Sequence, residues 1–170
     1  MNYLINFKIP QGITGPTGLQ GVTGPTGSTP GLNAYAGRYS NTTQTLNLAI
    51  GSSTIIPLTN NMPNANSSYS TANSITISQS GIYEINYSVN LSAAVATTVT
   101  LAVRQNGSNI ASSLISRSLA VGTGSLYNGS VIVSLNNGDV IDMALSALLA
   151  VGVTLGSGTN AILTIKRLNN

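Results

Sequence analysis

The sequence predicts an all-β jelly-roll sandwich preceded by a short collagen-like segment. Glycine occupies every third position from Gly12 to Gly27, and this strict Gly-X-Y period is typical of a triple helix. Beyond residue 30, short runs of alternating apolar and polar residues recur between turn-forming residues, as in antiparallel sandwiches and barrels. Charged residues make up 5% of the chain, against about 25% in ordinary domains. Burial between subunits or a glycan coat is therefore expected to keep the protein from aggregating.

These observations divide the chain into three parts. We predict an N-terminal tail over residues 1–11, disordered or added to the native chain, then a collagen-like repeat over 12–29 and a β-jelly-roll head over 30–170. A triple helix consists of three chains wound around one another. Only glycine fits at the crowded axis where the three chains meet. Proline occupies only two X positions, Pro16 and Pro25, so six triplets should not hold three chains together alone. A flexible Gly-rich linker and a stub of a longer repeat are the alternatives.

Alternation predicts the strands of the head in order. Over residues 82–91, Tyr83, Ile85 and Tyr87 alternate with polar residues, which indicates a half-buried strand. Residues 99–104 alternate in the same way and lead to Asn106 and Gly107, a pair that favours a tight hairpin. The returning strand is expected over 108–118. Further strands are predicted over 127–135, 140–147 and 161–168, and weaker ones over 45–49, 54–58 and 74–78.

The residue types exclude several kinds of chemistry. The chain has no histidine and no cysteine, which excludes imidazole bases, thiol nucleophiles and thiolate metal sites. Its three carboxylates are Glu84, Asp139 and Asp142. Asp139 and Asp142 could form a catalytic pair or contribute to a calcium site, but a turn and a polar strand position explain them better. We therefore expect no enzymatic activity, no cofactor and no metal.

Partners are restricted by charge and length. The six basic residues are scattered, so nucleic-acid binding is not expected. The apolar run over residues 143–155 is too short to span a bilayer, and no membrane partner is expected. The stretch over residues 143–153 predicts either an exposed docking patch or, preferably, the interface of a homotrimer. The interface candidates are Tyr87, which also lies on the apolar face of its strand, and Leu145, Leu148, Leu149, Val151 and Val153.

Three stretches carry a family resemblance. Residues 80–87 resemble the Gly-x-Tyr strand entry, residues 137–141 the Gly-Asp-x-Val turn, and residues 161–165 the closing strand of heads of the complement and tumour-necrosis-factor type. With the glycine repeat before them, residues 12–170 resemble collagen-like proteins with such heads. The likeness is greatest to the collagen-like exosporium glycoproteins of bacterial spores, the BclA type, in a clostridial branch.

The resemblance implies a structural function. Such a protein has a trimeric head that nucleates the triple helix and projects from the exosporium, where other spore-surface proteins are its partners. Adhesion to host glycans or matrix proteins would be a further activity. Threonines of the repeat match the positions that carry O-linked sugars in the family, whereas Gln20 departs from that pattern. These candidates are Thr14, Thr17, Thr23, Thr26 and Thr29. The alternative is a receptor- or glycan-binding tip of a phage fibre or another adhesin.

Overall fold

The computed structural model describes residues 1–3, 8, 10–15, 18–21 and 33–168. The chain divides into two units, Met1–Pro30 and Gly31–Asn170. The described residues of the first unit are exposed and have no regular secondary structure, so the triple helix stays a prediction. Thr14 is among them, whereas Thr17, Thr23, Thr26 and Thr29 lie outside the described residues. In the described parts of the chain, no helix is long and apolar enough to cross a membrane.

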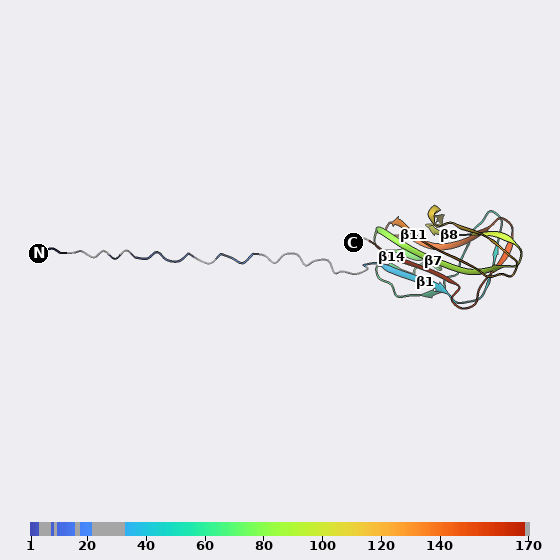
Figure 1. Cartoon of the computed structure of the whole chain (residues 1–170), viewed down its shortest axis with the longest axis horizontal. Helices are drawn as coiled ribbons and strands as arrows, with labels where there is room; N and C mark the ends of the chain where they lie inside the picture. The colour runs from blue at the N-terminus through green and yellow to red at the C-terminus, as the bar shows by residue number, and fades with distance from the viewer. Residues whose placement is uncertain (4–7, 9, 16–17, 22–32, 169–170) are drawn as a thin grey trace. The chain divides into compact units, whose positions relative to one another are not determined.

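The second unit, the head, consists of two β-sheets with antiparallel strand pairs (Figure 1). The first sheet has the order β2 (Thr45–Leu48), β13 (Val151–Leu155), β7 (Gly81–Ala93), β14 (Ala161–Arg167), β1 (Tyr35–Ser40) and β4 (Asn60–Asn61), with β11 (Ser125–Leu135) paired to β7. The second has the order β10 (Ile115–Leu119), β8 (Thr97–Gln105), β12 (Val140–Ala147), β6 (Ile75–Ile77) and β5 (Ser67–Ser68), with β3 (Thr54–Ile55) paired to β12 and β9 (Ser108–Asn109) to β8. Neighbouring strands are mostly far apart in sequence, and the predicted all-β jelly roll is confirmed.

The core lies between the two sheets. Along β7, every second residue is buried, while the residues that alternate with these are half-buried or exposed. The buried ones include Tyr83, Ile85, Tyr87, Val89 and Leu91. This is the alternation that a strand with one face on a core requires. Removing each such side chain from water stabilises the fold by about 1.5–3 kcal/mol. The apolar residues of the sequence pattern therefore fix which face of each strand turns inward.

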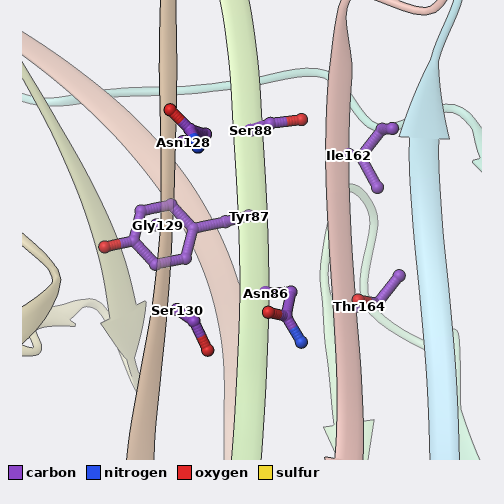
Figure 2. Close-up of a pocket in the computed structure, with 8 residues that line it drawn as sticks. All are labelled: Asn86, Tyr87, Ser88, Asn128, Gly129, Ser130, Ile162 and Thr164. Atoms are coloured by element: carbon purple, nitrogen blue, oxygen red, sulfur yellow. The ribbon is translucent and has the colours of Figure 1, made fainter.

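Tyr87 is accommodated in this core by a glycine on the neighbouring strand. The register of β7 and β11 places Tyr87 opposite Gly129, and Figure 2 shows the ring lying across β11 there. A Cβ at position 129 would lie 2.5 Å from the Tyr87 hydroxyl oxygen, so only glycine leaves room. The hydroxyl donates a hydrogen bond of 2.8 Å to the carbonyl of Ser113. Burial raises the pKa of Tyr87 above its ordinary value, so this donor stays protonated well into the alkaline range.

The predicted strand over 108–118 is interrupted in the structure. After β9 the chain forms a short 3-10 turn, Ala111–Ser113, before β10 begins. The buried Ser113 hydroxyl accepts a hydrogen bond from the Val103 amide at 2.9 Å and lies 2.7 Å from the Ile110 carbonyl. These side-chain hydrogen bonds compete with the ladder that a continuous strand would form.

Candidate functional site

The predicted interface residues lie in two different environments. Tyr87, Leu145, Val151 and Val153 are buried in the core of a single chain. Because a side chain enclosed by its own chain cannot contact another subunit, these four are core residues and not surface residues. The apolar run over residues 143–155 contains most of β12 and all of β13, which belong to different sheets. Both strands turn apolar residues toward the core between the sheets.

Leu148 and Leu149 remain on the surface. They lie in the turn between β12 and β13, and 77% and 40% of their surface is exposed. Leu148 also lines a depression of about 380 Å³ together with Ile50 and Ala147. Two separate leucines in a turn make a small contact area compared with the roughly 800 Å² per partner of a stable interface.

A larger regular surface is the side of the first sheet that faces away from the core, which we call the outer face. It carries the residues of β1, β14, β7 and β11 that alternate with buried ones. The pairing registers arrange them in rungs across the sheet. One rung is Tyr39, Ile162, Ser88 and Asn128; the next is Gly37, Thr164, Asn86 and Ser130; the third is Tyr35, Lys166, Glu84 and Ile132.

The outer face is nearly neutral. Its two charged groups form a pair, with Lys166 Nζ 3.7 Å from Glu84 Oε2. At its centre is an open groove of about 400 Å³, lined by the short side chains of Asn86, Ser88 and Thr164 among others (Figure 2). Such a face can pack against another protein surface without strong charge repulsion, and its amides and hydroxyls can exchange water for protein hydrogen bonds.

Three tyrosines, Tyr35, Tyr39 and Tyr69, lie outside the strands that the sequence predicts. Tyr35 and Tyr39 belong to β1 and lie on the outer face. The Tyr69 hydroxyl lies 3.1 Å from the Gly37 amide and 2.7 Å from the Met62 carbonyl, so it joins β1 to the segment after β4. The Arg38 guanidinium lies over the Tyr69 ring at 5.1 Å. Tyr69 therefore holds one edge of the outer face in place.

Two of the three carboxylates accept hydrogen bonds that join neighbouring segments of the second sheet. Asp142 accepts hydrogen bonds of 2.7 and 2.9 Å from Arg104 on the neighbouring strand. Asp139 accepts hydrogen bonds from the Gln105 and Asn106 side chains and from the Asn136 amide. Burial acts to raise the pKa of Asp139, but these three hydrogen bonds outweigh it and hold the pKa below its ordinary value. Both acids are structural groups, at the ends of β8 and β12.

Asp139→Asn is expected to destabilise the head at neutral pH by about 1–3 kcal/mol, because an amide donor would face groups that already donate. The lowered pKa means that Asp139 stabilises the fold above pH 3.8, its ordinary pKa, and that this contribution is lost as the pH falls below that value. Thermal unfolding at pH 7 and pH 2 should show a difference between wild type and variant that shrinks in acid. A difference that does not depend on pH would contradict the ionised Asp139.

The fold is that of the tumour-necrosis-factor and complement C1q heads. The chain is similar to murine APRIL at pH 5.0, with 14% identity, a TM-score of 0.59, and coverage of 79% of this chain and 98% of that one. It is also similar to the Eiger TNF from S. frugiperda, at 10% identity, a TM-score of 0.58, and coverage of 80% and 92%. The globular domain of the zebrafish complement 1qA protein matches at 12% identity and a TM-score of 0.51, with coverage of 81% and 98%.

Within that fold class, residues 37–169 match the family model of the BclA C-terminal domain. The match covers most of the chain, and the protein belongs to the family that carries this domain. A comparison with curated proteins found no match. The resemblance carried by residues 80–87, 137–141 and 161–165 is therefore confirmed for the head, whereas the clostridial branch stays a prediction.

Sequence reasoning identified three strands of the outer face, β7, β11 and β14, but neither β1 nor the face itself. Asn86, Ser88, Asn128 and Ser130 were assigned only to the polar side of their strands. The available signal was in residues 131–133, which are all apolar. In a strand with one face in the core, three successive apolar residues place one of them, Ile132, on the opposite face.

Proposed function

We propose that this protein is a non-enzymatic structural component of the bacterial spore exosporium. Its head would form a homotrimer and nucleate a collagen-like stalk from the repeat before it. One observation carries the proposal: a strict glycine repeat, which requires three chains, directly precedes a BclA C-terminal domain. A head that associates in threes gives that repeat the number of chains it needs.

On the spore, the heads would face outward and the stalks would join them to other surface proteins. Exposed threonines such as Thr14 would be acceptors for O-linked sugars, and the glycan would compensate for the scarcity of surface charge. Contacts with host glycans or matrix proteins would follow from this display. Immunogold labelling of intact spores with an antibody against the head tests the location, and label confined to the spore interior would contradict it.

The outer face is the proposed contact surface of the trimer. The outer face is suitable for burial against a second copy of the protein because it is nearly neutral, has regular rungs and carries exposed aliphatic side chains. A closed ring of three requires each chain to use two unlike patches, and a sheet that is several strands wide offers two unlike edges. Burial of this face would also hide part of a weakly charged surface from solvent.

Sedimentation of the full-length protein at micromolar concentration should give three times the mass of the 17.3 kDa chain. Thr164→Arg should convert this species to monomers, because each of the three contacts would enclose an unpaired cation at the centre of the outer face. Ser118→Arg, an exposed position on the second sheet, is the matched control and should stay trimeric. A monomeric wild-type protein would contradict the proposed function.

A further inference from the structure

The loops at one end of the head carry exposed aliphatic side chains and no charge. They are residues 49–53 between β2 and β3, 94–96 between β7 and β8, 120–124 between β10 and β11, and 148–150 between β12 and β13. None of these loops contains Asp, Glu, Lys or Arg. Their exposed aliphatic residues are Ile50, Val95, Val121, Leu148 and Leu149. We call this end of the head the tip.

The four loops form one continuous surface. Backbone hydrogen bonds join the loops to the ends of neighbouring strands. With the amide donor first, they are Ala94 to Gly152 at 3.2 Å, Gly122 to Ala93 at 3.0 Å and Leu148 to Thr98 at 3.4 Å. The loops over residues 49–53 and 148–150 also share the depression that Ile50 and Leu148 line. The aliphatic side chains of the tip are therefore held near one another by the fold.

The tip lies far from the beginning of the first strand. The pairing registers place Tyr35, where β1 begins, level with Lys166 and with Glu84 near the start of β7. The tip follows Ala93, where β7 ends. The steps from residue 84 to residue 93 along this strand span about 30 Å at roughly 3.3 Å per residue. The tip is thus the end of the head opposite to the one at which its first strand begins.

Charged side chains of the head lie behind the tip. Arg117 is opposite Val99, two residues from the start of β8, and its guanidinium lies over the Tyr127 ring at 5.8 Å. The ion pair of Lys166 with Glu84 is at the other end of the head. An ionic partner would find no group of opposite charge in the tip loops. A surface without net charge, by contrast, can cover them without removing an ion from water.

The shape of the tip favours a fluid partner over a rigid one. Its aliphatic side chains stand on separate loops, with 69% of Ile50 and 63% of Val121 exposed. A rigid protein would need a complementary pit for each loop, whereas a lipid bilayer deforms around separate projections. Peripheral binding to a bilayer is driven by the apolar area that enters it. The hydrogen bonds within the tip also reduce the number of backbone amides that would lose water without a partner.

We propose that the tip binds the surface of a zwitterionic lipid bilayer, with Val121 and Leu148 entering the boundary of the acyl chains. A phosphatidylcholine bilayer carries no net charge, which matches the uncharged loops. The sequence predicts no membrane partner because its apolar run is too short to span a bilayer, but a peripheral contact requires no span. The contact goes beyond the proposed structural function, and three heads in one trimer would bind more tightly than one.

The absence of tryptophan from the sequence permits a direct test. Leu148→Trp in the full-length protein places a single fluorescent reporter at the tip. We expect its emission to shift to the blue when phosphatidylcholine vesicles are added, and to be quenched by lipids brominated along the acyl chains. Leu114→Trp is the matched control, because Leu114 is an exposed aliphatic residue between the 3-10 turn and β10, outside the tip. This control should show neither effect.

Flotation with the same vesicles tests the protein without tryptophan. Val121→Asp/Leu148→Asp should lower the affinity for vesicles at least about tenfold, because two aliphatic contacts are replaced by charges. Leu114→Asp should bind as the wild type does, and both variants should keep the wild-type unfolding temperature because the altered side chains are exposed. Since the tip has no charge, binding should be unchanged by added salt or phosphatidylserine.

Three results would overturn the lipid contact: no flotation of the wild type, equal flotation of the double Asp variant, or flotation that requires phosphatidylserine. Blue-shifted emission of Leu148→Trp before vesicles are added would also overturn it, because the tip would then be covered by protein, such as a second copy. Sedimentation measures the trimer separately. A trimer that does not float leaves the proposed function standing, whereas a monomer that floats contradicts the proposed function and supports the lipid contact.

Discussion

Leu145→Asp is expected to leave no stably folded head. Leu145 is fully buried in the core and pairs across β12 and β8 with Leu101. Replacing it removes an apolar side chain, at a cost of about 2–5 kcal/mol, and places a carboxylate where it has no partner, which costs several more. The sum is comparable to the whole stability of a domain, about 5–15 kcal/mol. Circular dichroism should show loss of the cooperative thermal transition.

Leu149→Asp is the matched control for this prediction. Leu149 belongs to the same apolar run but lies in the exposed turn after β12, so its carboxylate would remain in water. The variant should unfold at nearly the wild-type temperature and sediment as the wild type does. If Leu145→Asp instead gave folded monomers, Leu145 would be an interface residue and its burial in the core would be contradicted.

Much of the fold was predictable because alternation is a physical requirement of a sheet with one face on a core. The strands β7, β11, β12 and β14 match their predicted ranges to within two residues at each end. Asn106 and Gly107 adopt positive φ angles of 53° and 81°, as the predicted hairpin requires. By contrast, β1 was not predicted, because Gly37 and Arg38 interrupt the alternation of apolar and polar residues. The extended conformation of β1 depends on its pairing with β14 and β4.

The proposed interface was less predictable from sequence, because the apolar character of a residue does not reveal what covers that residue. Leu145 and Val153 are as apolar as any contact residue, yet their covering is supplied by the opposite sheet of the same chain. The outer face is defined by register, which brings Lys166 and Ile132 into one rung from strands far apart in sequence. Pairing partners of this kind cannot be read from one strand alone.

The second prediction concerns which part of the protein assembles first, the head or the stalk. Six triplets with proline at two X positions would make a weak triple helix, since imino acids supply much of its rigidity. Association of three heads would raise the local concentration of the repeats to about the millimolar range. The head would then form the trimer first, and the stalk would wind as a consequence of that association.

Thr164→Arg is therefore expected to abolish the triple helix as well as the trimer, although residue 164 lies in the head. Gly18→Ala should do the reverse, because a Cβ at the axis disrupts the helix while the head stays trimeric. The far-ultraviolet circular dichroism band of the triple helix, followed with temperature, reports on the stalk, and sedimentation reports on the head. A Thr164→Arg protein that lost its trimeric heads but kept the triple-helix transition would show that the repeat assembles by itself. The head would then follow the stalk instead of nucleating it.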